Sequence, residues 1–298
     1  MKRYFLTAFC AFFAIASPGF SQDVVPDSRF IVSRGVDFYG GDLAPVFDTD
    51  LDSCIRACTI NDDCAALTFN QSSNACFPKK GIEREEKFNG AISARRVLTP
   101  QQIRTRAEGL RDHLDFVQDA TIDQAVAQAR DIGFRHPAGS ASSGDLIAAG
   151  QKASSEGRTR SALGWFGAAI SVNDDAVLWS EYARLRLDLA DQDKRARRKH
   201  FQEASYAALN AFLRGSTRPV RAEALRLFAM AVEKQGNGRM MIDALRLATD
   251  QHPRQDLNEM LDDAIGKYGF RVTATRVESD SAAPRICSEF SEPLVKAG

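Results

Sequence analysis

The stretch "CIRACTINDDCAALTFNQSSNAC", residues 54–76, holds four of the six cysteines in the chain. The cysteines are separated by three, five and eleven residues, so no C-x2-C pair occurs, and no histidine lies nearby. Zinc sites usually combine such close pairs with further cysteines or histidines, so this spacing disfavours a metal site. We therefore predict two disulfide bonds, which persist where the surroundings are oxidising.

Four cysteines allow three pairings, and geometry disfavours one of them. Cys54 and Cys58 are one helical turn apart, with β-carbons ~5–6 Å from each other, whereas a disulfide requires roughly 3.5–4.5 Å. Of the other two pairings we prefer Cys54–Cys76 with Cys58–Cys64. The first bond would tie a helix to a strand, and the second would close the exit of the helix. Closing the longer loop would contribute roughly 3 kcal/mol in the chain-entropy model.

The first 21 residues, "MKRYFLTAFCAFFAIASPGFS", have the composition of a secretory signal peptide. Lys2 and Arg3 precede an apolar run of 13 residues, and small residues follow Pro18. The run is shorter than the ~20 residues that cross a bilayer, so we expect no membrane span after cleavage. A lipoprotein anchor at Cys10 is the alternative, but the bulky Phe9 precedes it. The expected location is the periplasm or the secreted fraction.

Composition favours an ordinary soluble, folded protein of about two domains. Lysine plus arginine and aspartate plus glutamate both number 39, so the formal net charge is zero. Nothing in this balance favours nucleic acid or an anionic membrane as a partner.

We predict an α+β multidomain protein in four segments. A signal peptide (1–21) precedes a small disulfide-stapled domain (22–98), in which Thr49 would cap the helix that carries Cys54 and Cys58. An α-helical region (99–268) and a β segment (269–298) follow. The expected helices of the third segment are 100–117, 121–134, 143–156, 159–171, 174–190, 194–214, 218–234, 239–250 and 254–268.

The helical region has the rhythm of paired helices. "LIAAGQKASSEGRTRSALGWFGAAISVNDDAVLWSEYARLRL", residues 146–187, resembles a tetratricopeptide-like (TPR-like) repeat, although the period is irregular. The segment "HPAGSASSGD", residues 136–145, is typical of a flexible linker that would separate a two-helix adaptor from the array behind it.

Several residues of the helical region have two interpretations each. Trp165, Phe166 and Trp179 could line a ligand site, but their spacing favours helix packing. "DKRARRKH", residues 193–200, is compatible with an anionic partner or with a solvated helix face. The doublets Asp174–Asp175 and Asp262–Asp263 could form an acid–base or metal pair, but helix capping and solvent exposure are the simpler interpretations. We assign no chemistry to His113, His136, His200 or His252.

Two segments carry a family resemblance. "DFYGGDLAPVFDTDLDSCIRACTINDDCAALTFNQSSNACFPKKG", residues 37–81, resembles a PAN/apple domain, and more narrowly the PAN module at the N-terminus of bacterial alpha-2-macroglobulins. The resemblance implies the same nested disulfide pairing. "APRICSEFSEPLVKAG", residues 283–298, is similar to the start of the first β-sandwich that follows the helical region in that family. The resemblance thus implies that the chain is the N-terminal part of a longer protein, in which the unpaired Cys287 would bond to a later cysteine.

The resemblance implies membership of a protease-trapping system. The thioester motif C-x-E-Q is absent from the sequence, and no bait segment is recognisable. We therefore expect a non-catalytic recognition or scaffold region, without cofactor or metal. Its partners would be protein, including proteases bound through the full-length molecule, or carbohydrate. The alternatives are an independent exported adaptor and an enzyme, but no G-x-S-x-G motif, metal-ligand spacing or phosphate-binding glycine loop supports the enzyme.

A polar loop on a stapled scaffold is a natural contact surface. The candidate contact residues are Asn70, Gln71, Asn74, Lys79 and Lys80, for which an ordinary solvated turn is the alternative.

Overall fold

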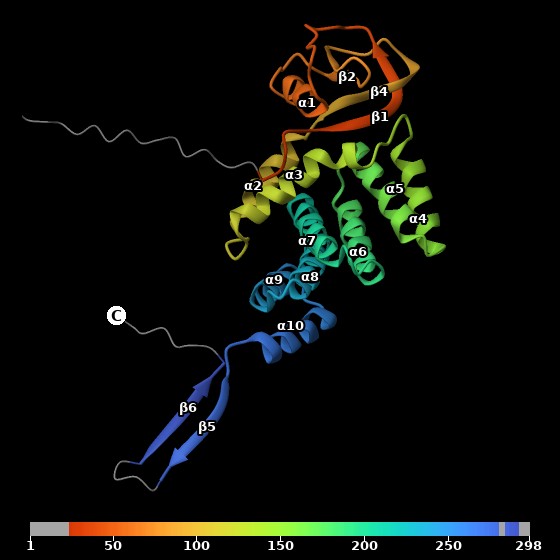
Figure 1. Cartoon of the computed structure of the whole chain (residues 1–298). Helices are drawn as coiled ribbons and strands as arrows, with labels where there is room; N and C mark the ends of the chain where they lie inside the picture. The colour runs from red at the N-terminus through yellow and green to blue at the C-terminus, as the bar shows by residue number, and fades with distance from the viewer. Residues whose placement is uncertain (1–23, 280–283, 292–298) are drawn as a thin grey trace, which may run out of the picture.

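The computed structural model describes residues 24–279 and 284–291, so the expected signal peptide (1–21) lies outside the described residues. A small domain with a β-sheet lies at one end of a stack of helices, and a β-hairpin lies at the other (Figure 1).

The N-terminal domain is a four-stranded antiparallel sheet with one helix. Its elements are β1 (Ser28–Tyr39), α1 (Leu51–Thr59), β2 (Ala66–Asn70), β3 (Ala75–Lys79) and β4 (Arg84–Leu98). The strand order is β1-β4-β2-β3, so the long β4 lies between β1 and the short β2–β3 hairpin. Helix α1 contributes its two cysteines to the same core as Phe30, Val32 and Leu67 of the sheet.

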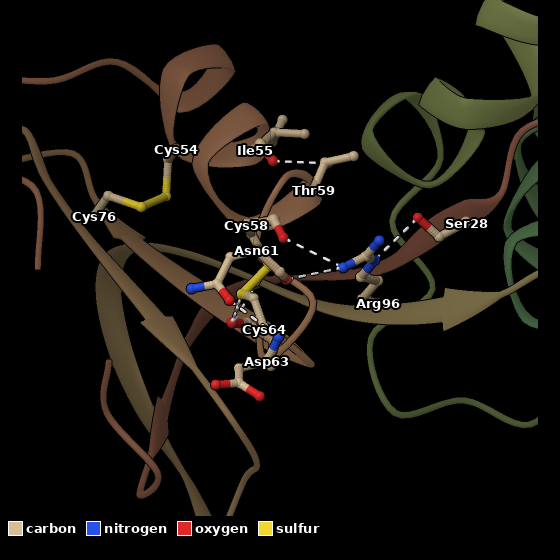
Figure 2. The surroundings of a disulfide bond; sticks show 11 residues. Ser28, Cys54, Ile55, Cys58, Thr59, Asn61, Asp63, Cys64, Cys76 and Arg96 are labelled. Carbon is tan, nitrogen blue, oxygen red and sulfur yellow. Dashed lines mark hydrogen bonds between the residues drawn. A yellow bond between two sulfur atoms is a disulfide. The ribbon is translucent and has the colours of Figure 1, made fainter. Parts of the chain in front are cut away.

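Two disulfides fasten α1 to the sheet. Cys54 is bonded to Cys76 of β3, and Cys58 is bonded to Cys64 just beyond the helix, which are the pairs preferred from the sequence (Figure 2). All four cysteines are buried. The domain has a small core, so these cross-links supply stability that burial alone would not.

Arg96 of β4 reinforces the exit of α1. Its guanidinium donates to the carbonyl oxygens of Cys58, at 3.4 Å, and Asn61, at 3.2 Å, and to the Ser28 hydroxyl, at 3.1 Å (Figure 2). A cation at this position complements the carbonyl-rich end of a helix. The C-terminal end of α1 is therefore held against β1 and β4.

The cap of α1 differs from the prediction. Thr49 does not cap the helix; Asp50 does, and its Oδ1 accepts from the Ser53 amide at 2.7 Å. The Thr49 amide instead donates to the Asn74 carbonyl oxygen at 2.9 Å. The chain approaching the helix is thereby tied to the β2–β3 turn, which delays the helix start by one residue.

The helical region contains nine helices within the part of the chain that the structure describes. They are α2 (Gln101–Arg111), α3 (Asp119–Arg135), α4 (Ser143–Ser155), α5 (Thr159–Val172), α6 (Ala176–Gln192), α7 (Arg197–Arg214), α8 (Arg218–Lys234), α9 (Gly238–Gln251) and α10 (Gln255–Tyr268). Each predicted helix corresponds to one of them. From α4 onward every helix packs on the next, and the short connections make neighbours antiparallel. This is the arrangement of a TPR-like array.

The segment 136–145 is not a linker between independent units. The Gly139 amide donates to the carbonyl oxygen of Val32 in β1 at 3.0 Å, and Ser142 caps α4. Helix α3 packs on α5 and α7, and α2 packs on α7. The prediction of a separate two-helix adaptor is therefore wrong: α2 and α3 belong to the helical body and join it to the N-terminal domain.

Close packing joins the sheet to α3. The Phe30 and Phe134 rings lie 5.7 Å apart. A Cβ added to Gly133 would lie 1.9 Å from the Phe30 carbonyl oxygen, so only glycine allows β1 this near to the helix. The N-terminal domain and the helical body therefore share a continuous interface.

A buried ionic cluster completes this interface. Arg29 of β1 donates through Nε to the Ser171 carbonyl oxygen at 2.9 Å and through Nη2 to that of Val172 at 3.2 Å, both at the end of α5. Its Nη1 lies 3.9 Å from Oδ2 of Asp174. The Oδ1 atom of Asp174 accepts from Nε of Arg214 at 2.6 Å and from the indole of Trp179 at 2.8 Å. One carboxylate thus links β1 to α6 and α7.

The C-terminal segment forms a hairpin of β5 (Val272–Glu278) and β6 (Arg285–Phe290). Cys287 lies on β6, exposed and unpaired. Among the described residues, no helix has the length and apolar content needed to cross a membrane.

Candidate functional site

A groove of about 580 Å³ lies where α1 of the N-terminal domain faces α3 of the helical body. We call it the junction groove. Its lining comes from both elements: Leu51, Asp52, Ile55, Arg56, Thr59 and Ile60 on one side, and Arg130, Asp131, Phe134 and Arg135 on the other.

The groove combines apolar side chains with arginines. Leu51, Ile55 and Phe134 also pack against the core of the N-terminal domain, so they form a fixed apolar floor. Ile60, directly after α1, is 84% exposed. An isoleucine this accessible at the rim of a hollow offers apolar area that folding has left unburied.

The arginines of the groove keep free donors. Nη2 of Arg56 donates to the Ser53 hydroxyl at 2.7 Å, and Nε of Arg130 donates to the adjacent Asp131 at 2.9 Å. Nη1 of Arg135 lies 3.3 Å from the Glu203 carboxylate. A guanidinium has five N–H donors, so each arginine can still bind carbonyl or carboxylate oxygens of a partner.

The structure does not bring the predicted contact residues together. Asn70, Gln71 and Asn74 lie at the tip of the β2–β3 hairpin, where Gln71 and Asn74 are exposed and Asn70 is half-buried. The Asn70 carboxamide oxygen accepts from the Ser72 amide at 2.9 Å. Lys79 is the last residue of β3, paired with Ala66 at the start of β2, and Lys80 follows it, so both lie at the opposite end of the hairpin from the tip.

The two lysines also differ from each other. Lys79 is buried and its ammonium pairs with Asp42, so it is not available to a ligand. The prediction of Lys79 as a contact residue is therefore wrong. Lys80 is exposed and lies 3.6 Å from Asp63. Burial of Lys79 follows from its position in a strand covered by the 42–49 segment, which pairs with β3.

An aromatic pair beside the hairpin tip was not predicted. Phe47 is 62% exposed, and its ring lies edge-on to that of Phe77, with centroids 6.3 Å apart. The backbone bonds between Val46 and Cys76 bring the two rings together across the sheet edge. The sequence shows a phenylalanine at position 47, but it carries no local signal for the approach of Phe47 to β3 or for its exposure.

The residues with two interpretations are mostly structural. Phe166 and Trp179 are buried in the helical core, while Trp165 is 43% exposed. Asp175 caps α6, as the capping interpretation of the doublet expects, whereas Asp174 is the centre of the buried ionic cluster. Asp262 and Asp263 are exposed on α10, and no group of three potential metal ligands occurs in the described residues.

His136 and His200 belong to a partly buried polar network around Arg186. Nη2 of Arg186 donates to the Tyr182 hydroxyl at 2.7 Å, so that hydroxyl can donate to Nε2 of His136, 2.9 Å away. Burial, with Arg186 and Arg135 nearby, lowers the pKa of His136 to about 4. His136 is thus a neutral acceptor at physiological pH. Burial and Arg186 also lower the pKa of His200.

Comparison with known proteins identifies the N-terminal domain. A family model described as "PAN domain" matches residues 28–99. The solved structure of the Arabidopsis OM64 TPR domain is similar at 18% identity, covering 41% of this chain and 93% of that chain, with a TM-score of 0.35. No curated protein matches. The chain therefore carries a PAN domain at residues 28–99, and the helical array described above follows it.

Proposed function

We propose that the chain is a non-catalytic recognition adaptor that binds a segment of a partner protein in the junction groove. The PAN domain and the TPR-like array are both architectures that serve protein binding, and the groove is built from the two together. The observation that carries the proposal is the exposed Ile60 in a groove that is also lined by three apolar side chains and three arginines.

The composition of the groove favours protein over other partners. The centres of protein interfaces are enriched in apolar residues and arginine, while lysine and glutamate are depleted. The groove follows that pattern in its cations, which are Arg56, Arg130 and Arg135 without a lysine, and departs from it in two aspartates, Asp52 and Asp131. The close contacts of α1 and α3 with the rest of the molecule hold the groove open, which lowers the ordering cost of binding.

The same proposal places the chain outside the cytoplasm. The two disulfides support an oxidising compartment such as the periplasm. Mass spectrometry of the mature protein from its natural host would test this, since a product that begins at Met1 and carries reduced cysteines contradicts export.

A finer proposal follows from the resemblance to bacterial alpha-2-macroglobulins. In it the chain is an accessory region of a periplasmic protease inhibitor, without the bait region and the thioester. The test compares protease inhibition by the chain alone and by the product of the reading frame extended beyond codon 298. Inhibition by the extended product alone supports the accessory role, and an immediate stop codon removes it in favour of an independent adaptor.

The groove is tested by selecting binders from a random peptide library on the full chain. We expect enriched peptides to lose at least tenfold affinity on Ile60→Asp, because burying one isoleucine is worth about 1.5–3 kcal/mol. Val177→Asp is the matched control, since Val177 is 58% exposed on α6, away from the groove. Peptides that bind both variants equally well, or no enrichment at all, contradict the proposal.

The hairpin tip favours a second candidate function, carbohydrate binding. Phe47 offers an exposed apolar face, and the backbone bond from the Thr49 amide to the Asn74 carbonyl oxygen ties its segment to the tip, which carries the Asn70, Gln71 and Asn74 amides. A glycan array probed with the wild type and with Phe47→Ala tests it, and Phe88→Ala is the control because Phe88 is another exposed phenylalanine of the same domain. Signals that survive Phe47→Ala remove the candidate.

A further inference from the structure

A second hollow, of about 460 Å³, lies between the start of α7 and the end of α8. Five basic residues line it, namely Lys194, Arg195, Arg197, Arg198 and Lys234, together with Phe201 and two glutamines. No acidic residue is among the lining residues. We call this hollow the cationic groove.

The charge of the cationic groove is a local feature, because the chain as a whole has a formal net charge of zero. Within the described residues, no carboxylate lies within ion-pair distance of Lys194, Arg195 or Arg198. Nε of Arg197 donates to the Ala190 carbonyl oxygen at 3.1 Å, which leaves its charge unpaired. Lys234 lies 4.0 Å from Glu233, at the limit of an ion pair.

The neighbouring acids are engaged elsewhere. Asp193 accepts from the Ala196 amide at 3.1 Å and from Arg160 at 3.2 Å. Glu233 accepts from Lys267 at 3.0 Å and from the Tyr268 hydroxyl at 2.9 Å. Glu233 and Asp193 therefore compensate the positive charge of the groove only in part, since five basic residues line it.

Folding does not explain this arrangement. Arg197 and Arg198 occupy the first turn of α7, where the amide groups of the helix already carry positive partial charge. Cations there oppose the helix dipole and repel one another. The same first turn has no side-chain cap, so its amides remain available to an anion. A bound anion would relieve both unfavourable terms.

We propose that the cationic groove binds a ligand with clustered phosphate or sulfate groups. A single carboxylate would offset one of five cations, whereas two or more multiply charged oxyanion groups match the density of charge. The guanidinium groups suit such ligands because each can form paired hydrogen bonds to a phosphate or sulfate. The volume fits a small oligomer or the end of a longer chain, with Phe201 as an apolar wall. This binding is independent of the junction groove.

Calorimetry on the full chain at low ionic strength tests the proposal. The probes are inorganic tripolyphosphate, a fully sulfated tetrasaccharide, the matching unsulfated tetrasaccharide and a hexaglutamate peptide. We expect binding of the first or second probe, weakened by added salt because ions screen exposed charges, and none of the unsulfated sugar. The first two probes distinguish a free polyphosphate from a sulfated glycan as the source of the anion.

The test variant is Arg195→Ala with Arg198→Ala, and the control is Lys152→Ala with Arg158→Ala. Both pairs are exposed, and both remove two positive charges near a turn between helices. We expect at least a tenfold loss of affinity in the first variant and less than a twofold change in the second, with circular dichroism confirming that both fold. Three results would overturn the assignment. They are equal losses of affinity in the two variants, no binding of tripolyphosphate or of the sulfated tetrasaccharide to the wild type, and tighter binding of hexaglutamate than of those two probes.

Discussion

Replacement of Asp174 by alanine tests how the two domains are joined. Asp174 is buried and lies between two arginines, with its Oδ1 2.6 Å from Nε of Arg214 and its Oδ2 3.9 Å from Nη1 of Arg29. Burial alone would raise the pKa of Asp174, but Arg214 and Arg29 outweigh it and hold the pKa below its usual range. Asp174 is therefore ionised in the folded protein at neutral pH.

The variant leaves two buried guanidinium groups without their counter-ion. Removing one member of a buried ion pair costs about 3–5 kcal/mol, because the remaining charge stays in a poorly solvated site. Arg29 retains its bonds to the Ser171 and Val172 carbonyl oxygens, which favours the lower part of this range at that end. Arg214 has the closer contact with Asp174, so we expect most of the loss there.

Urea unfolding followed by circular dichroism measures the effect. Asp175→Ala is a matched control, since Asp175 is the adjacent residue and caps α6, and loss of such a cap costs about 1 kcal/mol. A double-mutant cycle should give a larger coupling of Asp174 to Arg214 than to Arg29. If Asp174→Ala destabilises the protein no more than Asp175→Ala, the ionic cluster is not an important part of the junction.

Three further predictions concern stability. Gly133→Ala should destabilise the protein by about 1–3 kcal/mol, because the added Cβ would overlap the backbone of β1. Gly164→Ala should stabilise it by up to about 1 kcal/mol, because the space around Gly164 is open. Thermal melts of both variants check this. The lowered pKa of His136 means that the unfolded chain binds a proton at this residue more tightly than the folded protein does. The contribution of His136 to the free energy of unfolding should therefore be fully present above about pH 6.5 and fall by about 3 kcal/mol towards pH 4. His136→Gln should remove that part of the pH dependence, and parallel curves for the two proteins would contradict it. Removing the Cys54–Cys76 bond should cost about 3 kcal/mol and the Cys58–Cys64 bond about 2 kcal/mol, because the entropy cost rises with the logarithm of the length of the closed loop. Denaturant midpoints in the reverse order would count against this account.

The sequence predicts the elements well because their signals are local. The helix from Arg218 to Lys234 is predicted at its observed bounds, because Pro219 marks its first turn and Gly236 follows the end of its regular apolar pattern. The four clustered cysteines likewise indicate a stapled domain without knowledge of distant contacts. Element type and order therefore follow from short stretches of chain.

The contacts between elements could not be predicted because they join residues far apart in the chain. Gly133 is an ordinary helical glycine until the carbonyl group of Phe30 is placed against it. Asp174 is one half of a capping doublet until Arg29 and Arg214 approach it. The 136–145 segment has the composition of a linker, and the bond from the Gly139 amide to β1 makes it part of the junction.

The candidate sites follow the same division. The basic residues 194–198 are visible in the sequence, and what turns them into a groove is Lys234 on the next helix, together with the engagement of nearby acids elsewhere. The junction groove has no local signal, because α1 and α3 meet only after folding.

The fixed junction decides how the two candidate sites can act. Three contacts connect β1 to the helical body: the close approach of Gly133, the Phe30–Phe134 ring contact and the ionic cluster around Asp174. The PAN domain therefore cannot rotate relative to the helical array without breaking several buried interactions at once. A partner in the junction groove would then meet a preformed surface, and its affinity would depend on side chains such as Ile60 rather than on domain closure. Substitutions that loosen the junction should weaken binding of that partner, even where the substituted residues do not contact it. They should leave oxyanion binding at α7 and α8 unchanged, because the cationic groove is lined only by the α6–α7 connection and these two helices.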